Sequence, residues 1–506
     1  MGRFPQPRTA LLPASVFFLL MTGWIFTLAE GEPSPAASWV IVGAQVADGT
    51  GRPLRRANVR IVGDRIAEVG LFRPRGDERV VSAAGLVLAP GFIDIHNHSA
   101  ERLENDPLAE SQVSQGIATI VVGPDGDSPW PIGEYLQKLR QAPPALNVAV
   151  LVGHATVRQK VMRQDYRRPA RREEIAAMEK LVEQGMREGA LGLSSGLEYD
   201  VGSYSTTEEV VRLARVAARF GGFYMTHIRD EADRTLAALR EAITISEKAR
   251  IPVQISHIKM GTAGVWGRAA EAVRMIEQAR RRGVEITADC YPYDAWHSTI
   301  VVLVPNKRYD DPASVERALA DVGGAANVTI TECAAHREYE FRTLEEIARE
   351  KGVAPVEMFL RIVKDGGAEI ICHSMKEGDI REFYRQRWVM VASDGSIGGR
   401  HPRGAGTFPK VLGHYVREQR WLTLPDAVRK MTSLPAGRLR WSDRGVIRSG
   451  MTADLTLFNP TTVTDRSTFS EPEKRSAGIE KVYVNGELVW DAGKPTGARP
   501  GRVVTR

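Results

Sequence analysis

Two histidines, His96 and His98, carry the strongest chemical signal of the chain, in the run Gly91-Phe-Ile-Asp-Ile-His-Asn-His98. Alternate side chains of a strand point to the same face, so the two imidazoles lie on one side at the end of an apolar strand. There they can share one metal ion. The pair alone fits an ordinary surface or core position as well as it fits metal binding, so the case for a metal site depends on finding further ligands.

Histidines and aspartates end other apolar runs downstream at a regular spacing. His227 and His257 each end such a run, 30 residues apart, Asp289 ends the next one and Asp394 ends the last. A strand, a crossover helix and the next parallel strand take about 30 residues, so these side chains meet at one end of a parallel sheet. Apolar residues at three- and four-residue spacing predict the intervening helices, at 234–250 and 267–282.

These side chains need a scaffold that gathers many strand ends. Helical patterns separate most of the apolar runs, which predicts an α/β fold, a TIM-like (β/α)8 barrel with its active site at the carboxyl rim of the strands. The histidine and aspartate candidates then follow strands one, five, six and eight. The eight runs that fit strands are 91–96, 117–122, 147–152, 190–195, 222–227, 252–257, 284–289 and 388–394.

With His-x-His after strand one, His after strands five and six, and Asp after strand eight, the chain resembles the amidohydrolase superfamily of metal-dependent hydrolases. Within it, the chain is similar to the N-acyl-D-amino-acid deacylase (D-aminoacylase) family from about residue 39 to its end. Dispersed motifs in the same order are more specific than any single one. The motifs are Leu193-Ser-Ser-Gly-Leu197, Thr226-His-Ile-Arg229, Gln254-Ile-Ser-His-Ile-Lys259, Ser393-Asp-Gly395, His401-Pro-Arg403, Gly406-Thr-Phe408 and Met431-Thr-Ser-Leu-Pro-Ala436.

The resemblance implies a site for one or two zinc ions. His227 and His257 would hold the tightly bound ion and His96 and His98 the second position, with Asp394 beside both. Zinc lowers the pKa of a water ligand, and Asp394 would take its proton as hydroxide attacks the acyl carbonyl, then pass it to the amine. The implied reaction is hydrolysis of an N-acyl-D-amino acid to a carboxylic acid and a D-amino acid.

Asp125 departs from the family pattern. In the deacylases a cysteine ligand follows strand two in Val-Val-Gly-x-Cys-Gly, and here the matching string is Val121-Val-Gly-Pro-Asp-Gly126. A carboxylate is a competent but harder zinc ligand, so Asp125 would preserve the site, change its metal preference or leave it mononuclear. The alternative is that Asp125, between a proline and a glycine, makes a side-chain turn. No lysine follows strand four, which disfavours a carboxylated-lysine bridge.

Three further residues resemble the family's contacts to the substrate carboxylate. They are Arg403, Lys259 and Tyr291. Arginine offers a bidentate fork to a carboxylate, whereas lysine acts as a point charge. Alternatively, Arg403 and Lys259 are ordinary solvated surface residues, since the chain has 68 lysines and arginines.

The N-terminus has the composition of an export signal. Arg3 and Arg8 precede an apolar stretch, and Thr27-Leu-Ala29 fits a small-residue cleavage site. We therefore expect a signal peptide at 1–29, a linker at 30–38, and a periplasmic or secreted protein with no membrane span after cleavage. An uncleaved membrane anchor is the alternative, since a spanning helix needs about 20 apolar residues.

Composition fits a globular enzyme. The chain has 506 residues, 43% of them hydrophobic, which is enough for a large core. Three cysteines are too few for a disulfide framework. The net charge of +6, without a basic cluster interleaved with aromatics, gives no sign of nucleic-acid binding. The oligomeric state is not readable from the sequence.

The barrel does not account for the whole chain. The resemblance implies a small β-sandwich domain built from both chain ends, 39–85 and 441–506, around a catalytic barrel at 86–440. The stretch between strands seven and eight is too long for a simple crossover, which predicts an insertion at about 298–367 with a helix over 343–351.

Three functions remain open at this point. The first is the zinc-dependent deacylase acting on a small N-acyl amino acid. The second is another reaction of the superfamily, on a cyclic amide such as a hydantoin or dihydropyrimidine, or on a dipeptide, because fold does not fix substrate. The third is a secreted binding protein that has lost activity.

Overall fold

The computed structural model describes residues 38–506. The predicted signal (1–29) and all but the last residue of the predicted linker (30–38) lie outside the described residues, so export stays a prediction. In the described part, no helix is both long and apolar enough to cross a bilayer. Cys290, Cys333 and Cys372 are buried and form no disulfide.

Eight parallel strands form the predicted barrel. The strands pair in chain order, and the ring closes where the last strand meets the first, through a parallel bridge between Asn97 and Gly395 and a 3.0 Å hydrogen bond from Asp394 N–H to the His96 carbonyl. The strands are β6 (Phe92–Asn97), β7 (Ile117–Val122), β8 (Asn147–Val150) continued by β9 (Val152–Gly153), β10 (Gly192–Gly196), β11 (Phe223–His227), β12 (Val253–Ile255), β13 (Ile286–Cys290) and β18 (Val389–Val391).

Amphipathic helices cover the barrel. In α6 the apolar side chains Val210, Leu213 and Ala217 recur at helical spacing and are fully buried, and the Thr206 hydroxyl caps the helix by accepting from Glu209 N–H. The helices of the barrel region are α1 (Glu110–Val113), α2 (Ile132–Gln141), α3 (His154–Met162), α4 (Arg172–Glu188), α5 (Asp200–Ser203), α6 (Thr207–Arg219), α7 (Thr235–Ala249), α8 (Ala269–Arg281), α12 (Glu377–Tyr384), α13 (Arg403–Lys410), η5 (Val411–Glu418), α14 (Leu424–Met431) and α15 (Ser433–Arg438).

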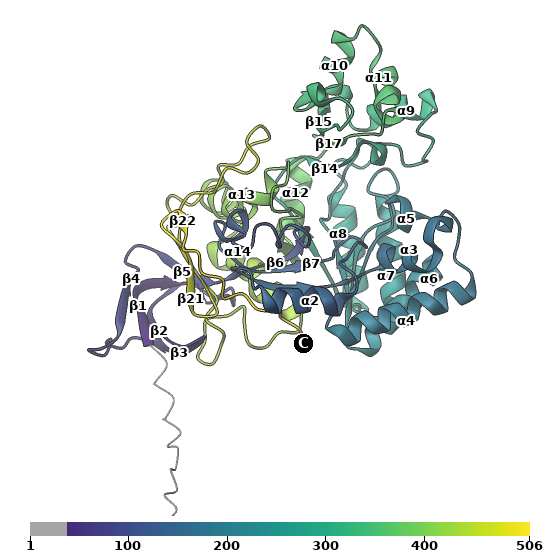
Figure 1. Ribbon diagram of the computed structural model, residues 1–506. Helices are drawn as coiled ribbons and strands as arrows, with labels where there is room; N and C mark the ends of the chain where they lie inside the picture. The colour runs from purple at the N-terminus through teal and green to yellow at the C-terminus, as the bar shows by residue number, and fades with distance from the viewer. Residues whose placement is uncertain (1–37) are drawn as a thin grey trace, which may run out of the picture. The chain divides into compact units, whose positions relative to one another are not determined.

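Strands from both chain ends build the predicted small β-domain. Figure 1 shows its purple N-terminal strands beside the yellow C-terminal ones. Its strands form one hydrogen-bonded sheet, β22-β21-β20-β19-β5-β1-β2-β3, with β4 paired to β1. The strand β5 lies inside the range predicted for the barrel, but it pairs with β19 and β1 of this sheet. The strands are β1 (Ser38–Val46), β2 (Arg55–Val62), β3 (Arg65–Gly70), β4 (Arg79–Ser82), β5 (Val87–Pro90), β19 (Leu455–Phe458), β20 (Ile479–Val484), β21 (Glu487–Asp491) and β22 (Lys494–Pro495).

The insertion between β13 and β18 is a folded unit with its own core. It starts at β14 and ends at β17, a few residues beyond the predicted 298–367 on each side, and its antiparallel sheet has the order β14-β17-β15-β16. Val315, Ile330 and Phe359 are among its fully buried residues. Its elements, green in Figure 1, are β14 (Trp296–Thr299), η2 (Ile300–Leu303), α9 (Pro312–Asp321), β15 (Val328–Glu332), β16 (Arg342–Thr343), α10 (Leu344–Glu350), α11 (Pro355–Lys364) and β17 (Glu369–Cys372).

Candidate metal centre and substrate pocket

The predicted metal ligands meet at the carboxyl rim of the barrel. His96 is near the end of β6, His227 ends β11, His257 follows β12 and Asp394 follows β18. All four are at most 5% exposed, whereas His98 is more accessible, with 39% of its side chain exposed. The barrel thus gathers polar groups that are up to 298 residues apart in the sequence into one buried cluster.

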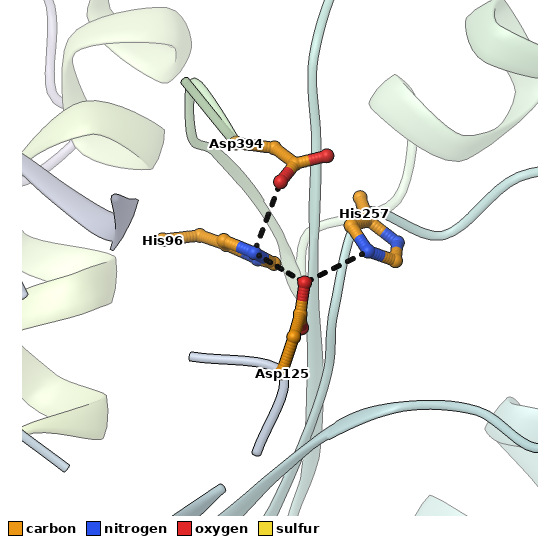
Figure 2. Close-up of side chains that lie close together, drawn as sticks. All are labelled: His96, Asp125, His257 and Asp394. Carbon is orange, nitrogen blue, oxygen red and sulfur yellow. Dashed lines mark hydrogen bonds and ion pairs between the residues drawn. The ribbon is translucent and has the colours of Figure 1, made fainter. Parts of the chain in front are cut away.

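The first group of possible ligands centres on His96 and Asp125 (Figure 2). His96 Nε2 lies 3.2 Å from Asp125 Oδ2 and 3.2 Å from Asp394 Oδ1. His98 Nε2 lies 3.1 Å from the same Asp394 oxygen, and His257 Nε2 lies 3.5 Å from Asp125 Oδ2. One ligand atom from each of His96, Asp125, His257 and Asp394 lies within 4.8 Å of the others.

A second group adjoins the first through His257. It consists of His227, His257 and Glu231, whose ligand atoms also lie within 4.8 Å of one another. His227 Nδ1 is 3.0 Å from His257 Nε2, and His257 Nδ1 is 3.1 Å from Glu231 Oε1. The two groups share a ligand, so the arrangement offers two neighbouring cation positions.

Asp125 lies where it can serve the metal rather than a turn. Its Oδ2 faces the imidazoles, and its Oδ1 is buried without a hydrogen-bond partner among residues 38–506, so no side-chain turn is formed. The following Gly126 has φ 87°, and a Cβ there would lie 2.8 Å from the backbone nitrogen of Gly196. The Gly126 N–H donates to the Ser194 hydroxyl. These contacts fix the loop that presents Asp125.

Three of these side chains stand on left-handed backbone. The φ angle is 54° at Asp125, 30° at His257 and 50° at Asp394. Non-glycine residues adopt this region rarely, and the energy cost is tolerated mainly where the surrounding structure imposes it, often at functional sites. Each of the three follows the end of a strand, and their ligand atoms meet in the first ligand group.

The electrostatics show a strong demand for positive charge. Burial alone would lower the pKa of His96, but Asp125, Asp394 and Asp289 raise it well above its usual value. Burial alone would raise the pKa of Asp125, but His96 and His257 lower it well below the usual range. The pKa of Asp394 is also lowered well below its usual range, against burial, first by Arg403. The attraction between the buried carboxylates and the cationic groups therefore exceeds the cost of removing these charges from water.

Asp289 orients two of the histidines from behind. It is fully buried, its Oδ1 lies 3.3 Å from His96 Nδ1, and the same oxygen accepts from His257 N–H at 2.8 Å. Gln254 donates to its other oxygen. A carboxylate that holds the far nitrogen of an imidazole fixes the tautomer and leaves Nε2 free to bind metal.

This donor set fits a divalent metal ion. Imidazole nitrogen and carboxylate oxygen are ordinary zinc ligands, and an unpartnered buried Asp125 oxygen supplies a further donor. A metal cation at the centre of the groups would balance the negative charge of the carboxylates, which protonated imidazoles otherwise balance.

The three residues predicted to bind the substrate carboxylate also come together, in a pocket beside the metal centre. This inner pocket is bordered by His227, His257, Lys259, Tyr291 and Arg403. The Arg403 guanidinium lies 2.6 Å from Asp394 Oδ2 and over the Tyr291 ring, 4.9 Å from its centre. Lys259 Nζ lies 2.5 Å from Glu231 Oε2 and 2.7 Å from His257 Nδ1. Both cations thus link the pocket to the ligand groups.

Sequence reasoning missed four residues of this region. Glu198 Oε2 lies 2.8 Å from His227 Nε2, and Tyr199 Oη lies 3.1 Å from His227 Nδ1. Glu231 belongs to the second ligand group and His297 of the insertion borders the inner pocket. Only Glu231 carried a signal, because it stands four residues after His227 in a region rich in carboxylates. Nothing in the sequence places the others at the rim.

His154, which follows β9, has a structural role. Its Nε2 lies 2.9 Å from Glu209 Oε1, and the same carboxylate pairs with Arg158. All three side chains are fully buried. They anchor α3 to α6 and take no part in the ligand groups.

Comparison with known proteins gives consistent results. A model of the amidohydrolase family matches residues 79–490. A D-aminoacylase from Alcaligenes xylosoxydans xylosoxydans is 36% identical over 492 residues, which cover 92% of this chain and 97% of that protein. From the same organism, an N-acyl-D-glutamate deacylase is 36% identical, covering 92% and 96% of the two chains, and an N-acyl-D-aspartate deacylase is 35% identical, covering 94% and 96%.

Solved structures agree. A crystal structure of D-aminoacylase has a TM-score of 0.85 and 36% identity, covering 92% of this chain and 99% of that one. An N-acyl-D-glutamate deacylase from Bordetella bronchiseptica, solved with zinc and a phosphonate that mimics the tetrahedral intermediate, has a TM-score of 0.85 and 34% identity, covering 93% and 100%. A D-hydantoinase, with a TM-score of 0.57 and 16% identity over 92% and 98%, shares only the fold.

Proposed function

This chain belongs to the amidohydrolase family, and from that premise we propose that it is a zinc-dependent enzyme that hydrolyses the amide bond of N-acyl-D-amino acids. The observation that carries this proposal is the meeting of two ligand groups with Lys259, Tyr291 and Arg403 in one pocket. A metal centre beside two cationic side chains suits a substrate that contains both an amide bond and a carboxylate.

Both ligand groups are proposed to hold zinc. His96, Asp125, His257 and Asp394 would hold one ion, with His98 at its edge, and His227 with Glu231 and the shared His257 a second. A solved relative, the Bordetella deacylase, contains zinc, and for D-aminoacylase a binuclear metal centre is described. When bound, zinc would lower the pKa of a water molecule so that hydroxide is available at neutral pH, and would polarise the acyl carbonyl.

Asp394 is the proposed general base and acid. Its Oδ1 faces the ligand nitrogens of His96 and His98, and its Oδ2 is held by Arg403. Because its pKa is well below the usual range, the carboxylate is ionised and ready to accept a proton as the new C–O bond forms. The same proton then passes to the amide nitrogen as the C–N bond breaks, which releases a carboxylic acid and a neutral amine.

Arg403, Lys259 and Tyr291 are proposed to bind the carboxylate of the amino-acid part. A carboxylate on Arg403 would share the guanidinium that now holds Asp394, and so would weaken that ion pair. Substrate binding would therefore make Asp394 a stronger base at the moment it is needed. Selectivity for the D-enantiomer rests on the deacylase relatives, which act on D-amino-acid derivatives by name.

The alternative activities have less support. The hydantoinase resemblance is limited to the fold at 16% identity, whereas three deacylases match nearly the whole chain at 35–36%. A binding protein without catalysis would not need buried carboxylates converging on three buried imidazoles. We infer hydrolysis of an acyclic amide of a small-molecule amino acid.

The test is metal analysis of the mature protein together with chiral assay of racemic N-acetyl amino acids. We expect one or two zinc ions per chain and release of the D-amino acid only. An Asp394→Asn variant should lose most turnover while it keeps its fold. Zinc with turnover of hydantoins, and none of acyl amino acids, would contradict the proposal.

Residues 1–29 are proposed to direct export. Support comes from Arg3 and Arg8 before the apolar stretch and from the small-residue site ending at Ala29. N-terminal sequencing of protein recovered from the periplasm or medium should begin at Glu30. An intact N-terminus in the membrane fraction would favour the anchor instead.

A further inference from the structure

Two of the deacylase relatives are named for glutamate and for aspartate and the third for no particular amino acid, and overall identity does not distinguish among them. Resting on the proposed function, we propose that the inner pocket selects an N-acyl-D-amino acid with an apolar side chain and excludes one with a second carboxylate. The inference follows from what the insertion and the barrel place around this pocket.

The insertion supplies an apolar wall. Val302 and Leu303 of η2, Ala318 of α9 and Val322 just after it border the inner pocket, together with the barrel residues proposed to hold the metal and the carboxylate. Leu303 is 5% exposed, and Ala318 and Val322 are each 2% exposed. A backbone hydrogen bond of 2.7 Å from Ala263 N–H to the Asp321 carbonyl ties α9 to the loop after β12. The wall is therefore fixed to the barrel.

The cations of the inner pocket are already assigned. Among its lining residues in the described range 38–506, the only lysine and arginine are Lys259 and Arg403, and each is ion-paired, with Glu231 and Asp394 respectively. Both are needed for the substrate carboxylate that every N-acyl amino acid carries. The nearby imidazole of His297 adds no charge, because burial and Arg403 lower its pKa to about 3.

The remaining charges of the pocket are negative. Glu198 and Asp321 border it together with Glu231. A second carboxylate on the substrate would therefore lie near anions with no additional cation from the described lining. Like-charge contact in a largely desolvated site is strongly unfavourable, whereas an apolar side chain gains by covering Val302 and Leu303.

An outer pocket adjoins the inner one and is the main alternative for an acidic side chain. It shares Glu198 and Val302 with the inner pocket and is bordered by Lys307. It also holds Asp200, Asp230 and Glu241, of which Glu241 pairs with Arg229. Its lining carries four carboxylates, those of Glu198, Asp200, Asp230 and Glu241, against the three cations Arg229, Arg234 and Lys307, so it offers no net positive charge to a further carboxylate.

The experiment compares kcat/KM for N-acetyl-D-leucine, N-acetyl-D-glutamine and N-acetyl-D-glutamate on the zinc-loaded enzyme. Glutamine and glutamate have nearly the same shape, so their ratio isolates the charge. We expect leucine to exceed glutamate by about 100-fold or more, with glutamine between them. N-acetyl-D-lysine, tested alongside, sets the apolar wall against Glu198 and Asp321, whose charges would favour an ammonium group, and leucine should remain the faster substrate if the wall dominates.

A Val302→Arg variant tests the cause. Val302 is half-buried and borders both pockets, so a longer side chain can enter the inner one. It should raise the glutamate-to-leucine ratio of kcat/KM by about tenfold. Val301→Arg is the matched control, because Val301 borders only the outer pocket, and it should leave that ratio unchanged.

The outcomes separate this inference from the proposed function. No turnover of any N-acyl-D-amino acid would refute the function. Turnover in which glutamate or lysine equals or exceeds leucine would leave the function intact and overturn the inference. Loss of glutamate turnover in Lys307→Ala would also overturn it, since it would place an acidic side chain in the outer pocket. The wild-type series decides the matter even if Val302→Arg does not fold.

Discussion

Replacing Asp125 by alanine should strongly weaken metal binding, because this carboxylate is central to the first ligand group. Its Oδ2 lies 3.2 Å from His96 Nε2 and 3.5 Å from the Nε2 atoms of both His98 and His257. Removal leaves three imidazoles without the anion they share, and Asp394 as the one remaining carboxylate of the first ligand group. Loss of a residue that only orients a ligand lowers metal affinity about 10–100-fold. Loss of a direct ligand should reach at least the upper end, about 100-fold or ~2.7 kcal/mol.

The measurement is zinc affinity by competition with a chromophoric chelator at fixed pH, with metal content after dialysis as a second readout. Asp125→Asn keeps the shape without the charge and should behave nearly as alanine does. Asp125→Cys restores the softer ligand that the deacylase pattern has here, and should recover zinc binding. With Co²⁺ in place of zinc, only this variant should gain a thiolate-to-metal absorption band.

Asp127→Ala is the matched control. Asp127 lies two residues further along the same loop, is exposed, and contacts the Thr156 hydroxyl rather than any imidazole. Its loss should leave zinc affinity unchanged. The reasoning fails if Asp125→Ala keeps the affinity and stoichiometry of the wild type, or if Asp127→Ala weakens binding equally, since the effect would then come from the loop and not from the ligand.

Three other predictions concern the carboxylate site, the barrel closure and a buried charge. Arg403→Ala should raise KM for N-acetyl-D-leucine about 10–100-fold, but should affect the uncharged N-acetyl-D-leucinamide much less; an equal effect on both would argue against carboxylate binding. Asp94→Ala removes the acceptor of hydrogen bonds from Asn97 and from Ser393 N–H and Oγ, so denaturant unfolding should show a loss of about 2–4 kcal/mol. Burial lowers the pKa of Lys430 to about 8, so the unfolded chain binds more protons between pH 8 and 10.5 and wild-type stability should rise relative to Lys430→Met over that range, by up to about 3 kcal/mol. Thermal unfolding of both proteins at pH 7 and pH 10 measures this, and a constant difference would contradict it.

The barrel could be predicted because its strands leave a clear pattern in the sequence. Strands buried on both faces are continuous apolar runs, and the predicted 117–122 coincides with β7. The polar residue that ends each run is at the rim by topology alone, which is why His227, His257 and Asp394 could be placed together. Periodicity does not say which sheet a strand joins, however. That is why β5, another short apolar run, was assigned to the barrel although it pairs with β1 and β19.

The rest of the site could not be predicted because it depends on loops and on the insertion. Glu198 reaches His227 from the segment after β10, and His297 reaches the pocket from β14. Neither position has a fixed relation to the strand period. Their placement follows from tertiary packing, which no local pattern in the sequence records.

The residues at strand ends and those of the insertion also have different proposed roles, the first in the reaction and the second in substrate selectivity. The groups proposed to bind metal and move the proton lie at or just after strand ends. The wall that meets the amino-acid side chain comes from η2 and α9, in an insertion with its own core. Of three relatives at 35–36% identity, one is named for glutamate, one for aspartate and one for no particular amino acid, so overall identity is a poor guide to the side chain accepted here. The charge balance of the inner pocket is the better guide, because its two cations are committed and its other charges are negative.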